Sequence, residues 1–306
     1  MGSSCPQSEQ RLHAYRTRHL SDLVLEIPPF HVQVRSPFRT VHAHLGFFYP
    51  EQARSAAGAF VDFEVALLPG RGLRRWWAPQ SRFALDGDEP FYPLSARQAA
   101  PMFEWGLNWC VAQRPLGYLV MHAAVLADDD RAIMLPGFPG AGKSTLCAAL
   151  ALCAGWRLLS DELAILDPAD ACLVPHPRPI SVKNESIDIV ASFPGARLGP
   201  VYRDTRKGSV CHVAPAPAAV AQASRRAKVS WVVFPRFDAA AEPYCEEISR
   251  IEAFTLISEQ SFNNERMGQL GFQALCAMLD GARCWEIRYR STAEALALVR
   301  HIRGAA

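Results

Sequence analysis

A glycine-rich stretch, Gly137-Phe138-Pro139-Gly140-Ala141-Gly142-Lys143-Ser144, constrains the fold more than any other part of this chain. It fits the pattern G-x-x-x-x-G-K-[ST], in which glycines without a Cβ let backbone N–H groups converge on phosphate oxygens. The apolar run 132–135 predicts a buried strand before the loop, and the Ala/Leu-rich run 145–153 predicts a helix after it. The chain is therefore expected to carry a phosphate-binding loop between a strand end and a helix start.

The residues of this loop have distinct expected roles. The helix N-terminus adds partial positive charge, Lys143 can reach the β- and γ-phosphates, and the Ser144 hydroxyl can bind Mg²⁺. The alternative is a glycine-rich turn that binds nothing, but the pattern arises by chance in only roughly one chain in a hundred. Nucleotide binding, with ATP and Mg²⁺, is therefore expected through Gly137, Gly140, Ala141, Gly142, Lys143, Ser144 and Thr145.

Composition narrows the class of protein. With 306 residues, 50% of them hydrophobic and 20% charged, the chain can form one large domain or two ordinary ones. A formal net charge of +2 does not favour binding to nucleic acid or to an anionic membrane. Nine scattered cysteines without a C-x-x-C motif predict reduced thiols, and no apolar run reaches transmembrane length. We therefore expect a cytoplasmic protein.

The N-terminal third differs from the rest of the chain. Residues 1–20 are polar and are expected to be loose, whereas residues 21–94 contain short apolar or alternating runs and predict a small β-rich region. Trp76 and Trp77 either pack on that sheet or form a binding face, and packing is the expectation. A helix over about 95–113 is expected to open the P-loop domain, residues 95–306.

The remaining segments complete an α/β fold with a mixed sheet. Besides the strand before the loop, strands are expected at 118–126, 157–160, 229–234 and 284–289, and helices at 249–261, 265–280 and 292–303. The stretch 199–227 is irregular and basic and is expected to be a mobile loop.

Two features outside the loop indicate a reaction. Asp161 and Glu162 follow the strand after the loop helix, where a carboxylate could bind Mg²⁺ through water or accept a proton from an attacking hydroxyl. The alternative is an acidic turn. His122 ends the strand that precedes the loop strand and could orient Asp161 or tune its proton affinity, although a single His in an apolar run is more often a core residue.

Three runs together resemble the catalytic domain of HPr kinase/phosphorylase: 122–126 (His-Ala-Ala-Val-Leu), the loop, and 157–162 (Arg-Leu-Leu-Ser-Asp-Glu). In that family a His opens the strand before the P-loop, and a His-x-Leu-Val-Ala-Asp-Asp-like strand follows the loop helix. The resemblance covers about residues 115–190 well. More specifically, the chain resembles the HPr-kinase-related group A proteins, through Ser261-Phe262-Asn263 and Gly271-Phe272.

The resemblance implies a P-loop kinase core like that of phosphoenolpyruvate carboxykinase, transfer of phosphate to a protein serine, and assembly into a homo-oligomer. It implies that Asp161 is the catalytic carboxylate, with His122 beside it and Glu162 next to it. Glu162 replaces the family's second Asp, and the later Arg-Pro-Gly-Arg-Asn signature is not found. Charge for the transition state could come instead from Arg178, Lys183 or Arg236, each equally an ordinary surface cation, and Asn263 could contact nucleotide or end a helix.

The leading hypothesis is an ATP- and Mg²⁺-dependent kinase, with Asp161, His122 and Lys143 as catalytic residues and Ser144 and Glu162 as metal ligands. Its acceptor would be a hydroxyl, as on serine, of a protein or peptide, and the group A resemblance points to peptide-modification systems. Two alternatives stay open: an ATP-binding regulatory module without transferase activity, and a small-molecule kinase.

Overall fold

A computed structural model describes residues 23–55, 60–138 and 140–305. The segment 1–20, expected to be loose, lies outside the described residues. The chain divides into two compact units, the first ending at Leu107 and the second beginning at Asn108. This division falls inside helix α3 (Ala99–Gln113), whereas the sequence placed the domain boundary before that helix. The two units are described separately.

The first unit is built on a sheet with the strand order β3-β1-β2-β4-β5-β6, which lies in the part of the chain where the sequence predicts short strands. Strand β2 pairs in parallel with β4, and the other pairs are antiparallel. A parallel pair needs a crossover connection, and helix α2 (Arg39–Phe48), which the sequence analysis missed, lies in that connection. The strands are β1 (Leu23–Ile27), β2 (Phe30–Arg35), β3 (Ala53–Ser55), β4 (Phe63–Pro69), β5 (Gln80–Leu85) and β6 (Leu94–Ser95).

A buried polar cluster joins α2 to α3 inside this unit. The Nε2 atom of His44 lies 2.6 Å from Oε1 of Glu104, and the Tyr49 hydroxyl donates to both carboxylate oxygens of Glu104 at 2.9 and 3.0 Å. All three side chains are buried, so this carboxylate depends on these donors for its solvation.

The tryptophan pair does not pack on the sheet. Trp76 and Trp77 follow a short 3-10 helix, η1 (Gly72–Arg75), and are 80% and 81% exposed. The expectation of packed aromatics is therefore wrong, because the chain leaves the sheet after β4 and returns to it only at β5.

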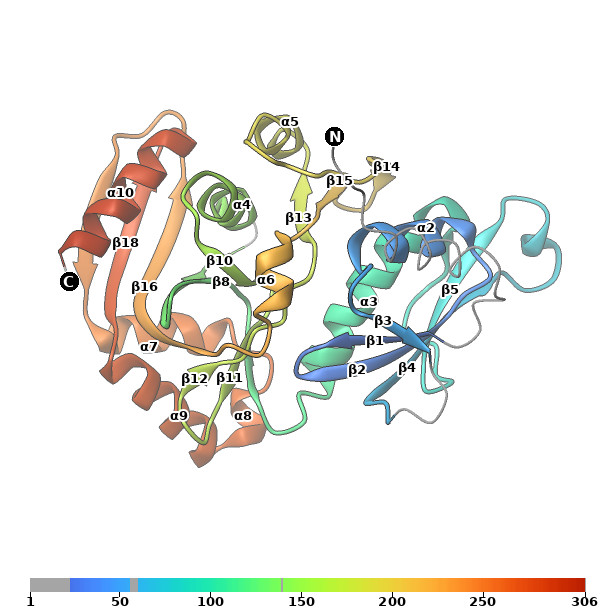
Figure 1. Ribbon diagram of the computed structural model, residues 1–306, viewed down its shortest axis with the longest axis horizontal. Helices are drawn as coiled ribbons and strands as arrows, with labels where there is room; N and C mark the ends of the chain where they lie inside the picture. Colours follow the sequence, from blue (N-terminus) through green and yellow to red (C-terminus); the bar gives the residue numbers. More distant parts are fainter. Residues whose placement is uncertain (1–22, 56–59, 139, 306) are drawn as a thin grey trace, which may run out of the picture. The chain divides into compact units, whose positions relative to one another are not determined.

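The second unit contains a mixed sheet with the strand order β10-β8-β9-β16-β12-β11-β7, in which β18 pairs with residues 231–237 of β16 and also with β17 (Figure 1). Strands β9, β16 and β18 run parallel, and the other pairs are antiparallel, so the expected mixed α/β class is confirmed. Its strands are β7 (Leu119–Met121), β8 (Ala123–Asp128), β9 (Arg131–Pro136), β10 (Arg157–Ser160), β11 (Ala164–Asp167), β12 (Cys172–Leu173), β16 (Ala227–Phe237), β17 (Tyr244–Ile248) and β18 (Arg283–Tyr289).

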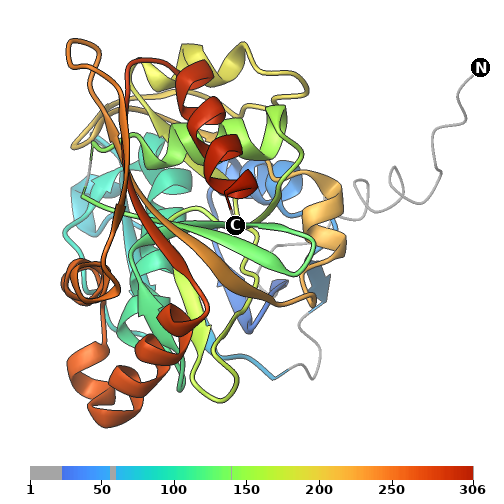
Figure 2. The ribbon, with the colours of Figure 1, turned by 90° about the vertical axis from the view of Figure 1, so that its left-hand side faces the viewer.

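Helices cover both faces of this sheet (Figures 1 and 2). Helices α4 (Lys143–Cys153) and α10 (Thr292–Gly304) pack on one face, around Trp156 and Trp231. Helices α7 (Arg250–Glu259) and α9 (Gln269–Asp280) pack on the other, around Leu275 and Ile257. The sheet is therefore buried from both sides, which is why its central strands are continuous apolar runs. The short α8 (Asn264–Met267) precedes α9.

The segment expected to be a mobile loop is ordered, and that expectation is wrong. It forms β14 (Tyr202–Thr205), β15 (Gly208–Val213) and α6 (Pro217–Ala221). Strand β15 pairs with β13 (Ile180–Lys183), which leads into α5 (Ser186–Ala191). Val210, Cys211 and Val213 are buried by this pairing, whose partner lies about 30 residues earlier in the chain and leaves no local signal.

In the described ranges, eight cysteines form no disulfide. None of the helices in these ranges is both long enough and apolar enough to cross a bilayer.

Replacing Gly106 with alanine tests the contact between α3 and β5. A Cβ at Gly106 would lie 2.0 Å from Cε2 of Phe83, so the ring or the helix has to move. We expect Gly106→Ala to lower the free energy of unfolding by about 1–3 kcal/mol, measured by urea denaturation. The control is Gly304→Ala, since Gly304 is exposed with open space around its Cβ position. Equal stability of the two variants would contradict the close packing.

Candidate functional site

The glycine-rich loop has the predicted local structure. Strand β9 ends at Pro136 and helix α4 begins at Lys143. Gly137, Gly140 and Gly142 have φ angles of 143°, 90° and 89°, in a region that L side chains rarely adopt. Pro139 lies outside the described residues. The first N–H groups of α4 have no partner within the helix, so this end can bind an anion.

The ends of strands β16 and β18 contact the glycine-rich loop. The Phe237 N–H donates to the Ala141 carbonyl at 3.2 Å. A Cβ at Gly142 would lie 2.5 Å from the Tyr289 hydroxyl and 3.2 Å from Cβ of Phe237. The ends of β16 and β18 therefore set the path of the loop, and glycine at 142 is required both by its φ and by this contact.

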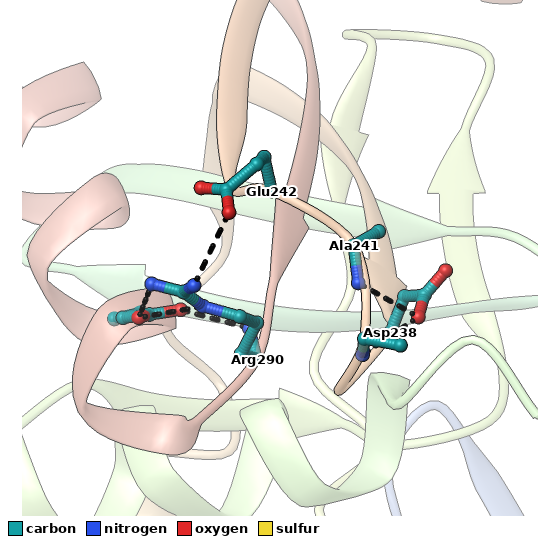
Figure 3. A network of polar contacts seen from close by, with 6 residues as sticks. Asp238, Ala241, Glu242 and Arg290 are labelled. Carbon is teal, nitrogen blue, oxygen red and sulfur yellow. Dashed lines mark hydrogen bonds and ion pairs between the residues drawn. The ribbon is translucent and has the colours of Figure 1, made fainter.

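A polar network fixes these strand ends (Figure 3). The Asp238 N–H donates to the Tyr289 carbonyl at 3.0 Å, and the Asp238 carboxylate accepts from the backbone of Ala240 and Ala241. Arg290 pairs with Glu294 at 3.0 Å and with Glu242 at 3.7 Å. The residues next to Phe237 and Tyr289 are thus held on both strands.

Lys143 lies inside the loop. Its side-chain amino group donates to the Gly137 carbonyl and, at 3.1 Å, to the Phe138 carbonyl. Burial lowers the pKa of Lys143, while Asp161 and Glu162 act in the opposite direction. The ammonium group therefore has two carboxylates within electrostatic range and holds loop carbonyls that phosphate oxygens can replace.

Asp161 is the most perturbed acid of the site. It is only 4% exposed, its Oδ2 accepts from the Ser181 N–H at 2.9 Å, and its Oδ1 has no hydrogen-bond partner. The pKa of Asp161 is raised to about 7, chiefly by burial and also by the neighbouring Glu162, and the Ser181 amide, the Ser144 hydroxyl and Lys183 offset part of this rise. Asp161, which directly follows β10, therefore lies beside Ser144 of the first turn of α4.

Glu162 belongs to a separate hydrogen-bond network, which includes Asn108 and Arg178. Its Oε2 accepts a hydrogen bond from the Asn108 side-chain amide, and the Asn108 Oδ1 accepts from the Arg178 guanidinium. Arg178 is 6% exposed, so it is a buried cation rather than a surface one. Arg178 is therefore connected to Glu162 through Asn108.

His122 lies close to Glu162 and Lys143. The imidazole is half-buried, and burial lowers the pKa of His122, as does Lys143, while Glu162 and a hydrogen bond with Gln260 oppose this shift. Its ring centroid is 6.2 Å from that of Phe262. The His122 backbone N–H donates to the Gln260 carbonyl at 2.8 Å, which ties this residue to the segment that follows α7.

The other predicted residues have varied surroundings. The Thr145 hydroxyl donates to the Ser186 hydroxyl at 2.9 Å, which ties α4 to α5. Lys183 ends β13 within electrostatic range of Asp161 and Lys143. Arg236 is exposed, one residue before Phe237.

The Asn263 side chain makes hydrogen bonds with the backbone of Tyr118 and Val120. It is buried, its Oδ1 accepts from the Val120 N–H at 2.9 Å, and its Nδ2 donates to the Tyr118 carbonyl at 2.8 Å. The Phe262 N–H donates to the Val120 carbonyl at 2.9 Å. Asn263 therefore binds the 261–263 segment to β7 and keeps Phe262 beside His122.

Four residues of this site escaped the sequence analysis: Asn108, Ser181, Lys207 and Tyr289. Burial lowers the pKa of Lys207, Glu162 opposes this shift, and Lys183 adds to it. The sequence offered one signal for Lys207: the chain has only four lysines, and Lys183 interacts electrostatically with both Lys143 and Lys207. The other three residues stand in ordinary helix or strand sequence and could not be identified without the fold.

No protein-family model matches this chain, and no curated protein matches it. The geometry therefore carries the functional argument. Cationic side chains, amides at a helix start and a carboxylate with a free oxygen can together bind a phosphate group and accept a proton.

The stability of Asp161→Asn should depend on pH relative to the wild type. Because the folded pKa of Asp161 is about 7 against an ordinary 3.8, the folded state keeps a proton that the unfolded state releases between these values. This group's contribution to stability therefore falls as pH rises from about 4 to about 7. Without nucleotide, Asp161→Asn should be more stable than wild type at pH 8, by up to about 4 kcal/mol, and this difference should shrink towards pH 4 in urea unfolding.

The exposed Asp280→Asn variant is the control and should show no such trend, since its carboxylate is 78% exposed. A difference between Asp161→Asn and wild type that is constant with pH would contradict the raised pKa.

Proposed function

We propose that this chain is an ATP- and Mg²⁺-dependent phosphotransferase that moves the γ-phosphate to a hydroxyl group, as on serine, of a protein or peptide. One observation carries the proposal: the buried carboxylate of Asp161, with one oxygen unpartnered, lies beside Ser144 at the start of the P-loop helix. A loop that only stored phosphate would not need an acid with a free oxygen there.

Binding of the triphosphate is assigned to the loop and to Lys143. The backbone amides of Gly140, Gly142 and the first turn of α4 surround the phosphates, and Lys143 exchanges the carbonyls of Gly137 and Phe138 for phosphate oxygens.

Proton transfer is assigned to Asp161. A general base works best when its pKa is near the working pH, and the pKa of Asp161 is raised to about 7. The Ser181 amide holds Oδ2 and leaves Oδ1 to accept the proton of the attacking hydroxyl. In-line transfer then needs little beyond positioning and charge neutralisation.

The donor set suits Mg²⁺. The Ser144 hydroxyl and the Glu162 carboxylate, which lie on either side of Asp161 in the site, are the oxygen donors that would hold the ion. The described residues contain no group of three or more His, Cys, Asp or Glu that could hold a metal by themselves. Mg²⁺ bound mainly through phosphates and one or two carboxylates does not require such a group. When bound, it would neutralise charge on the transferring phosphate.

The acceptor class and the family rest on the resemblance to HPr kinase-related proteins. The grouping of His122, the loop and Asp161 in one site supports a P-loop kinase core of that type. We propose a serine-bearing protein or peptide, within a peptide-modification system, as the acceptor.

Lys143→Ala should abolish ATP binding, because it removes the only charge within the loop itself. Isothermal titration of ATP with Mg²⁺ measures this directly. Lys228→Ala is the matched control, since Lys228 is an exposed lysine of β16, and it should bind ATP as the wild type does. Unchanged affinity in Lys143→Ala would remove the phosphate-binding role of the loop.

Asp161→Asn should keep ATP affinity within a few-fold and lower phosphate transfer by about 10²-fold or more, as expected for loss of a general base. Transfer is measured by mass spectrometry of a cell extract incubated with the protein and ATP carrying ¹⁸O in its γ-phosphate, so that only new phosphoserine is heavy. Wild-type ATP binding without heavy phosphoserine would instead support a nucleotide-gated binding module. Heavy phosphate on a metabolite would support a small-molecule kinase.

A further inference from the structure

Strands β10, β9, β16 and β18 all end at the same edge of the sheet. Strand β8 is antiparallel to both β9 and β10, so β10 runs parallel to β9. Strand β16 is parallel to β9 and to β18. Val232 of β16 pairs with Met134 of β9 and with Cys284 of β18, so β9 and β18 lie on opposite sides of β16.

This strand order puts Asp161 and Phe237 on opposite sides of the glycine-rich loop. The order is β10-β8-β9-β16, and the loop follows β9. Asp161 directly follows β10 on one side, and Phe237 ends β16 on the other. The end of β18, at Tyr289, lies further out on the side of Phe237.

Phe237 contacts the loop without using its aromatic ring. Its N–H donates to the Ala141 carbonyl at 3.2 Å, and its Cβ lies 3.2 Å from the position of a Cβ built on Gly142. The residue is 47% exposed. A phenyl ring beside a phosphate-binding loop is therefore left partly open to solvent.

The position of this ring is fixed from the neighbouring strand. Tyr289 is the register partner of Phe237, and the two ring centroids are 6.0 Å apart at an interplanar angle of 55°. Tyr289 is itself only 4% exposed. A partly exposed ring that rests on a buried one is a suitable stacking surface, because every nucleobase offers a flat π face to an aromatic side chain.

The direction of the nucleotide follows from the two sides of the loop. In the proposed function the terminal phosphate faces Asp161, and the loop amides bind the phosphates. The nucleoside then leaves the loop on the opposite side, above the ends of β16 and β18. Open α/β sheets commonly bind ligands at the carboxyl ends of their strands in this way.

We propose that the ring of Phe237 is the surface on which the nucleobase of bound ATP stacks. The inference rests on the proposed function and adds to it a residue outside the P-loop motif that recognises the base. It predicts that Phe237 contributes to the binding of nucleotides and not to the binding of phosphate chains without a base.

The test compares Phe237→Ala with Phe272→Ala in the full chain, by calorimetric titration with ATP, with ADP and with inorganic tripolyphosphate, each with Mg²⁺. Phe237→Ala should weaken ATP and ADP binding about tenfold, the effect of losing one base–aromatic stack. Tripolyphosphate binding should change less than about twofold, because alanine keeps the N–H and the Cβ that contact the loop.

Two further variants complete the comparison. Phe237→Trp keeps an aromatic face and should bind ATP at least as tightly as the wild type does. Phe272→Ala removes a phenylalanine of α9 that is 54% exposed, and it should change the affinity for none of the three ligands.

The outcomes separate this inference from the proposed function. A wild-type protein that binds neither ATP nor tripolyphosphate contradicts the proposed function. Unchanged ATP affinity in Phe237→Ala, with ATP bound by the wild type, overturns the role of Phe237 alone. An equal loss for ATP and tripolyphosphate would mean that the ring acts through the shape of the loop, and it would also overturn the stacking role.

Discussion

The site depends on a carboxylate that the fold keeps out of water. Asp161 is 4% exposed and receives one backbone hydrogen bond, so its ionised form is poorly solvated and its pKa rises to about 7. This poorly solvated carboxylate lies next to Ser144, in the first turn of α4. Perturbed acids of this kind are common where a group has to take up and release a proton, whereas an acidic turn in solvent would titrate normally.

The shape of the loop depends on parts of the chain distant in sequence. Gly142 is confined by the Tyr289 hydroxyl and by Phe237, which stand at the ends of two parallel strands. Both strands are buried between helices, and the Asp238 and Arg290 contacts hold their ends. The loop is therefore positioned by the sheet, in the way that open α/β sheets place ligands at the carboxyl ends of their strands.

The cations of the site come from separate elements. Lys143 belongs to α4, Arg178 precedes β13, Lys183 ends β13, and Lys207 lies on the next hairpin. In the sequence of its own segment, none of these residues differs from an ordinary solvent-exposed cation. In the fold, Lys143 interacts electrostatically with Asp161, Glu162 and Lys183, and Lys207 interacts with Glu162 and Lys183.

The sequence by itself determined the strand–loop–helix unit, the acidic pair after the next strand, and the helices from residue 249 onward, because glycine spacing, periodicity and caps are local properties. Tertiary structure decided the rest. The β14–β15 hairpin forms by pairing with β13, and Trp76 is exposed. The Asn263 side chain accepts a hydrogen bond from β7. Strand pairing and burial between distant segments have no local pattern, so the roles of Asn108, Lys207 and Tyr289 followed only from their positions in the fold.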